Sequence, residues 1–66
     1  MKAEALAEKV KSSDMRMEEI AVALGMSLQT LYTKIRGESE FKVSEAVELK
    51  KALHLTTDQF MEIFFE

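Results

Sequence analysis

The sequence contains no cysteine and no proline, and glycine occurs only at Gly25 and Gly37. Without cysteine there can be no disulfide framework and no thiolate metal site, which fits a reducing interior. No apolar run approaches the roughly 18 residues that a membrane-spanning helix needs. The first residues, Met1-Lys2-Ala3-Glu4, lack the apolar stretch of a secretory signal. We therefore expect a soluble, cytoplasmic protein that makes no contact with a membrane.

The length of 66 residues suits one domain, which we place at residues 1–66. A domain of this size buries only about 60% of the surface that its unfolded chain exposes, so a partner subunit would help to complete its core. The net charge of −3 argues against nucleic-acid binding, because phosphates attract cations. Basic and acidic residues are balanced in residues 1–42, however, and the acidic excess lies entirely in residues 43–66. A DNA-binding surface should therefore lie in the first two thirds of the chain.

Helices are favoured throughout, because 47% of the residues are hydrophobic and turn signals are few. We predict an all-α fold with five helices, at about residues 2–11, 17–24, 28–36, 43–53 and 57–65. Apolar residues recur at helical spacing in each of them. The positions expected to face the core are Leu6, Val10, Met17, Ile20, Ala21, Leu24, Leu31, Ile35, Val43, Ala46, Val47, Leu49, Leu53, Phe60, Ile63 and Phe64.

Local signals mark the ends of these helices. Gly25 can adopt the left-handed conformation that ends the second helix, and Ser27 can cap the third by accepting a backbone hydrogen bond. Gly37 stops the third helix. Thr56 and Gln59 fit a capping box at the start of the fifth, in which the hydroxyl bonds forward and the amide reaches back.

The second and third helices are separated only by Gly25-Met26-Ser27. So short a turn makes the two helices cross steeply, as in a helix-turn-helix, where the second helix of the pair enters the major groove. The third helix has two faces. Leu31 and Ile35 point inward, and a polar stripe at i, i+3, i+4 and i+7 spacing points outward. That stripe consists of Gln29, Tyr32, Thr33 and Arg36.

The pattern around this turn comprises Met17–Ser27 (MEEIAVALGMS), Thr30-Leu31-Tyr32 and Arg36-Gly37, and it continues in Ala52–Thr56 (ALHLT). It resembles the lambda-repressor-like helix-turn-helix family, which includes phage and prophage Cro and repressor proteins. The resemblance implies a compact five-helix domain, DNA binding through the third helix and often a two-fold dimer. The family usually has threonine, glutamine and glycine where this chain has Arg16, Met17 and His54. Arg16 could supply as a cation part of the phosphate grip that the first two changes remove.

The sequence thus predicts a sequence-specific double-stranded DNA-binding transcriptional regulator. The alternative is a protein-interaction module on the same fold, such as an antirepressor. We expect no enzyme, metal site, cofactor or small-molecule substrate, because no catalytic or ligand constellation is present. Leu28 could lie at the core edge or near DNA, and Tyr32 could contact DNA or pack on the scaffold. The candidate DNA-binding residues are Arg16, Ser27, Leu28, Gln29, Tyr32, Thr33, Lys34, Arg36, Ser39 and Lys42.

The fifth helix carries more apolar residues than one helix needs to close a core. Met61 and Phe65 lie on a face beside the inward one, and next to Leu55 they would form an apolar patch of the kind that marks protein contacts. We expect a two-fold pairing of fifth helices through Leu55, Met61 and Phe65. Repulsion between Glu62 and Glu66 should make this homodimer weak until DNA binds.

Overall fold

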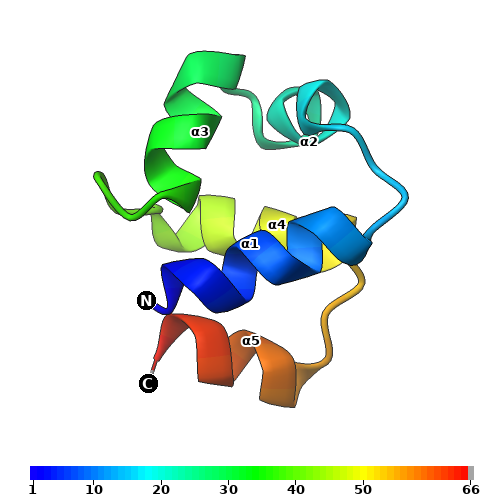
Figure 1. Cartoon of the computed structure of the whole chain (residues 1–66), viewed down its shortest axis with the longest axis vertical. Coiled ribbons are helices and arrows are strands. Elements are labelled where there is room, and N and C mark those ends of the chain that lie inside the picture. Colours follow the sequence, from blue (N-terminus) through cyan, green and yellow to red (C-terminus); the bar gives the residue numbers. More distant parts are fainter. Residues whose placement is uncertain (66) are drawn as a thin grey trace.

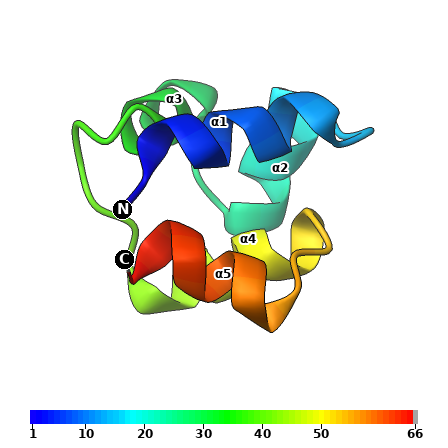
Figure 2. The same cartoon turned by 60° about the horizontal axis from the view of Figure 1, so that its bottom comes forward.

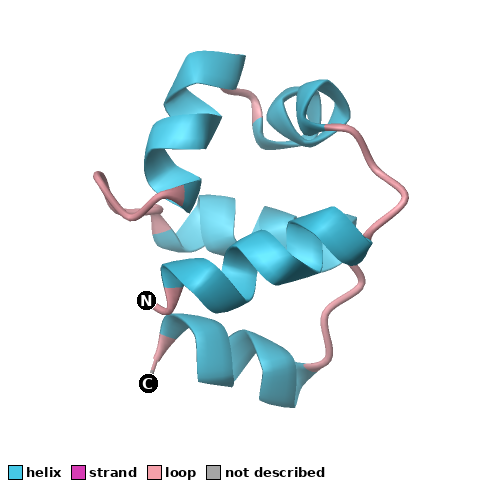
Figure 3. Cartoon of the chain, in the orientation of Figure 1, coloured by secondary structure: helices cyan, strands magenta, loops and turns pink. Residues whose placement is uncertain are grey.

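The structure is a computed structural model that describes residues 1–65. Glu66, which we expected to oppose pairing of the fifth helices, lies outside the described residues. The described chain forms five α-helices and no strand (Figures 1 and 3), so the all-α prediction is confirmed. The helices are α1 (Ala3–Ser12), α2 (Met17–Leu24), α3 (Leu28–Ile35), α4 (Val43–Ala52) and α5 (Thr57–Phe64). Each predicted boundary lies within one residue of the observed one.

The helices enclose one core. α1 runs across the molecule between α3 and α5, while α2 packs against both α3 and α4 (Figure 1). Seen from below, α4 and α5 form a layer beneath the first three helices (Figure 2). The two ends of the chain lie side by side, where the backbone N–H of Lys2 donates a hydrogen bond of 2.8 Å to the carbonyl of Ile63.

Every helix places at least one apolar side chain in this core. Leu6 of α1, Ile20 of α2, Leu31 of α3 and Leu49 of α4 are fully buried, and Ile63 of α5 is 2% exposed. These residues belong to one contiguous cluster. Removing most of such a side chain costs about 2–5 kcal/mol, because a cavity remains that the neighbours only partly fill.

Two residues expected to face the core do not do so. Val43 is 79% exposed and Val47 is 38% exposed. The buried face of α4 is centred on Ala46 and Leu49, with Leu53 packed against it. At 3.6 residues per turn, Val43 and Val47 lie about a quarter turn or more away from that face. The predicted inward role of both valines is therefore wrong.

The predicted helix ends are confirmed. Gly25 has a φ of 71° and ends α2 in the left-handed conformation. The Ser27 hydroxyl accepts a hydrogen bond from the Thr30 N–H at 3.1 Å. At α5, the Thr56 hydroxyl accepts from the Gln59 N–H at 3.1 Å, and the Thr56 N–H donates to Gln59 Oε1 at 2.9 Å.

His54 follows α4 with a φ of 55°, which is left-handed backbone in a residue with a side chain. The Leu55 N–H closes the end of the helix by donating to the Lys50 carbonyl at 3.0 Å. An L-residue in this conformation brings its Cβ close to the following carbonyl oxygen, at a cost of roughly 1–2 kcal/mol. The position therefore suits glycine, the residue that the family resemblance implied there.

Among the helices described, none is both long and apolar enough to cross a membrane.

Candidate nucleic-acid interface

The corner between α2 and α3 places α3 on the outside of the molecule. Only three residues join the two helices, and in Figure 1 α2 is seen nearly end-on whereas α3 runs along the page. The Met26 N–H donates to the Ala21 carbonyl at 3.0 Å, which closes α2 as the chain turns at Gly25. The steep crossing is therefore held by local backbone bonds and by the Ser27 cap.

The two faces of α3 divide as the sequence predicts. Leu31 and Ile35 are buried, while Gln29, Tyr32 and Arg36 are exposed. Thr33 is half-buried, and its hydroxyl donates to the Gln29 carbonyl one turn earlier at 2.9 Å. That bond leaves the methyl group and the lone pairs of the Thr33 oxygen for an external partner.

The first turn of α3 presents hydroxyl groups to solvent. Ser27 and Thr30 are both exposed, and the Ser27 hydroxyl donates to Thr30 Oγ1 at 2.8 Å. Thr30 was not among the expected site residues, although its position three residues after the cap is a sequence signal that could have identified it. Leu28 is 37% exposed at the edge of this turn, so it is accessible without being part of the core.

Lys34 is engaged inside the protein. Its Nζ lies 2.5 Å from Glu45 Oε1, and the two side chains are only 12% and 17% exposed. The same Glu45 oxygen accepts the backbone N–H of Lys42 at 2.9 Å. The hydrogen bond from Lys34, and then that from the Lys42 backbone, lower the pKa of Glu45. Lys34 therefore fastens α3 to the first turn of α4, and the phosphate contact expected of it would first require this pair to break.

Arg36 also has an acidic neighbour, but at the surface. Its Nε donates to Glu38 Oε2 at 2.9 Å, and both side chains are more than half exposed. This hydrogen bond, together with the attraction between the charges, raises the pKa of Arg36 and lowers that of Glu38. Because the pair is open to water, Arg36 can exchange Glu38 for another anion.

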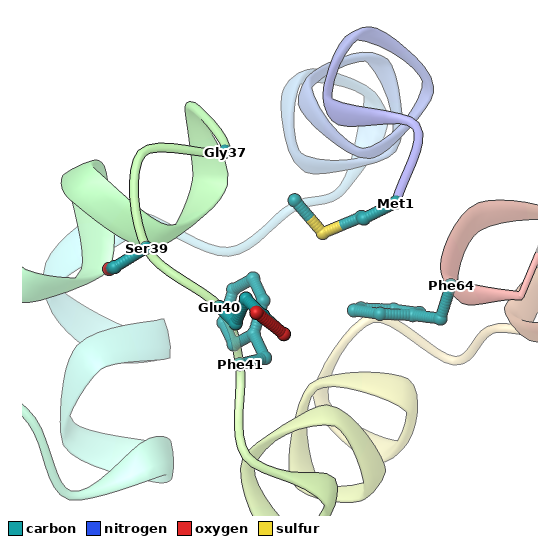
Figure 4. A pocket seen from close by; sticks show the side chains of 6 residues that line it. All are labelled: Met1, Gly37, Ser39, Glu40, Phe41 and Phe64. Carbon is teal, nitrogen blue, oxygen red and sulfur yellow. The ribbon is translucent and has the colours of Figure 1, made fainter.

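The other expected phosphate contacts lie around α3. Arg16 precedes α2 and is exposed, with its backbone N–H donating to Glu19 Oε1 at 2.8 Å. Lys42 precedes α4 and is exposed. Ser39 lies in the loop between α3 and α4, at the rim of a cavity of about 250 Å³ that Met1 and Phe64 also line, and its side chain points away from them (Figure 4).

Lys11 is a further cation near α3 that sequence reasoning did not select. It lies in the last turn of α1 and lines a depression of about 220 Å³ together with Met17 and Tyr32. This proximity joins residues from three helices, so local sequence patterns could not reveal it. Within residues 1–65, no group of three or more His, Cys, Asp or Glu side chains is arranged to hold a metal ion.

The expected dimer residues fall into two classes. Leu55 is 7% exposed and belongs to the core, so its side chain offers no surface to a partner. Met61 and Phe65 are 50% and 64% exposed. Phe65 lines a groove of about 270 Å³ between α4 and α5, together with the exposed Val43 and Val47.

A scan against protein-family models, a search of curated proteins and a search of solved structures found no match to this chain.

Proposed function

We propose that the protein is a sequence-specific double-stranded DNA-binding transcriptional regulator, in which α2 and α3 form a helix-turn-helix and α3 enters the major groove. The observation that carries this proposal is the exposed polar face of α3. The opposite face of α3 is anchored in the core by the buried Leu31 and Ile35. The left-handed Gly25 turns the chain between α2 and α3, so that the two helices cross steeply. A helix presented in this way fits the width of the major groove of B-DNA, about 12 Å.

The side chains on that face match the chemistry of base edges. Gln29 can form two hydrogen bonds with adenine, and Arg36 can do so with guanine once it leaves Glu38. The Thr33 methyl can contact a thymine methyl. Ser27 and Thr30, at the start of α3, can bind phosphate oxygens, a type of contact that fixes register without reading sequence.

The groove between α4 and α5 supports assembly as a two-fold dimer. Phe65 lines this groove, and the exposed Val43 and Val47 extend its apolar surface onto α4. Met61 is a further exposed apolar side chain of α5. Pairing of this surface with a second copy would bury it. The two copies of α3 could then meet half-sites about 34–36 Å apart, which is one turn of duplex.

Selection of bound duplexes from a random library tests both parts of the proposal. We expect a two-fold symmetric site to be enriched. Gln29→Ala should relax base preference at one position in each half-site, at a cost of about 1–3 kcal/mol, whereas Thr57→Ala, an exposed change on α5, should leave the selected sequence unchanged. Recovery of no preferred sequence, or an identical preference with Gln29→Ala, would count against base reading by α3.

A second candidate function is a protein-interaction module that uses the same surface. It is favoured by the ion pairs of Lys34 with Glu45 and of Arg36 with Glu38, which reduce the positive charge that α3 presents. It is also favoured by Val22 on α2, an apolar side chain that is 81% exposed. Binding to random duplex at low salt separates the two candidates. A DNA-binding regulator binds and loses affinity steeply as salt rises, whereas a pure protein-interaction module does not bind.

A further inference from the structure

The Lys and Arg side chains around α3 differ in whether an acidic side chain already pairs with them. Lys34 is held by Glu45, and Arg36 is neutralised by Glu38. By contrast, neither Lys11, in the last turn of α1, nor Arg16, directly before α2, forms an ion pair with any residue in the described part of the chain. Both side chains are exposed. Lys42, directly before α4, is also exposed and has no ion pair among the described residues. Most of the charge near α3 that is free to meet an external anion therefore belongs to the end of α1 and the start of α2.

Lys11 borders the same surface as the exposed face of α3. It lines a depression with Tyr32, which belongs to that face, and with Met17, the first residue of α2. Arg16 directly precedes Met17 in the chain and is the N-cap residue of α2. A duplex that receives α3 in its major groove has a phosphate strand on each side of the helix. The strand on the α1 side would pass along this edge.

We infer that Lys11 and Arg16 bind phosphates of the DNA strand on the α1 side of α3, so that the protein grips its site mainly from that side. This inference rests on the proposed DNA-binding function. Each phosphate neutralised by a free cation changes the slope of log K against log salt by about −0.9. When a side-chain cation leaves an internal carboxylate to bind a phosphate, few salt ions are released overall. The phosphate gives up a counterion, but the freed carboxylate attracts one from solution.

The charge distribution sets the expected size of the salt effect. Lys11, Arg16 and Lys42 are the exposed cations next to α3 that have no ion pair among the described residues. Three such contacts give a slope of about −2.7 per protein chain. The carboxylates of Asp14 and Glu18, which are exposed in the same segment, weaken the attraction and keep overall affinity for random duplex low.

The test measures the salt slope for binding of the 66-residue chain to a duplex that carries the selected site. Lys11→Ala and Arg16→Ala should each reduce the magnitude of the slope by about 0.9 per chain, and the double variant by about 1.8. Lys51→Ala is the matched control, since it removes the same charge from an exposed side chain of α4 and should leave the slope unchanged. Circular dichroism of each variant shows whether the fold is retained.

The outcomes separate this inference from the function on which it rests. If the wild type binds but the Lys11 and Arg16 variants keep its slope, the inference is overturned and DNA binding stands. If Lys51→Ala lowers the slope as much as Lys11→Ala, the effect reflects net charge and the inference is likewise overturned. If the wild type shows no salt-dependent binding to duplex, the proposed function fails and the inference fails with it.

Discussion

Glu45 joins two parts of the candidate interface, and its replacement should destabilise the whole domain. Its Oε1 atom accepts one hydrogen bond from Lys34 Nζ in α3 and another from the Lys42 N–H at the start of α4. Glu45→Ala removes both and leaves Lys34, which is 12% exposed, without its partner. Glu45→Gln keeps an oxygen for the Lys42 N–H, as Gln59 does for Thr56, and removes only the charge.

The magnitudes follow from the two interactions. A hydrogen bond to a charged group contributes about 1.5–3 kcal/mol, and partial exposure of this pair places its contribution near the lower end. The hydrogen bond at the start of α4 adds about 1 kcal/mol. We expect Glu45→Ala to cost about 2–3 kcal/mol and Glu45→Gln about 1–1.5 kcal/mol. In a domain of this size each kcal/mol lowers Tm by about 4–8 °C.

The pH dependence provides an independent check. The pKa of Glu45 is lowered in the folded protein, so its contribution to stability is present above the ordinary glutamate pKa. The contribution is lost as pH falls through the lowered value, because protonation then removes the charge. The difference in Tm between wild type and Glu45→Ala should therefore shrink on acidification.

The assay is thermal unfolding followed by circular dichroism at neutral and acidic pH. Glu48→Ala is the matched control, because it removes a carboxylate from the same helix whose pair with Lys51 is exposed and 3.7 Å long. This control should change stability by no more than about 0.5 kcal/mol. If Glu45→Ala melts like Glu48→Ala, or if its Tm deficit is the same at every pH, the tie between α3 and α4 does not contribute as argued.

Three further changes test other features. Gly25→Val should lower the free energy of unfolding by about 1–2 kcal/mol without DNA, because a residue with a side chain is strained at its φ of 71°. No clash with other parts of the chain adds to this strain, since the space around the added Cβ is open; a variant with wild-type Tm and lost DNA binding would contradict this. His54→Gly should raise stability by about 0.5–1 kcal/mol, since relief of left-handed strain exceeds the entropic cost of glycine, and an unchanged or lower Tm would refute it. Met61→Asp with Phe65→Asp should weaken self-association in sedimentation velocity, because two exposed apolar side chains, of which Phe65 lines the groove, would be replaced by charged ones. A wild type that stays monomeric at high concentration and on its DNA site would contradict the dimer.

The features predicted correctly from sequence are those fixed by nearby residues. Gly25 ends a helix because glycine adopts a positive φ with little strain. Ser27 caps the next helix because its hydroxyl reaches the Thr30 N–H within one turn. The same holds for Thr56 and Gln59. Such signals need no knowledge of the tertiary structure, and they placed all five described helices.

The features that sequence missed depend on how helices meet. Val43 and Val47 have suitable spacing for a core face, but the orientation of α4 is set by its packing against α2. Lys34 looked free beside a polar stripe, yet its partner Glu45 lies eleven residues away in another helix. Lys11 joined the candidate interface only because α1, α2 and α3 converge there. The polar face of α3 was predictable, whereas the availability of its charges was not.

The single core cluster, fed by at least one buried side chain from each helix, means that the domain has no separable half. Detaching α5 would remove Ile63 from this cluster and uncover the part of α1 against which α5 packs, so no pair of helices keeps a closed core on its own. Partly folded forms therefore have a high free energy, and we expect the domain to unfold in one cooperative, all-or-none transition. In hydrogen exchange, the slowest amides of the buried turns should share one opening free energy, equal to that of global unfolding.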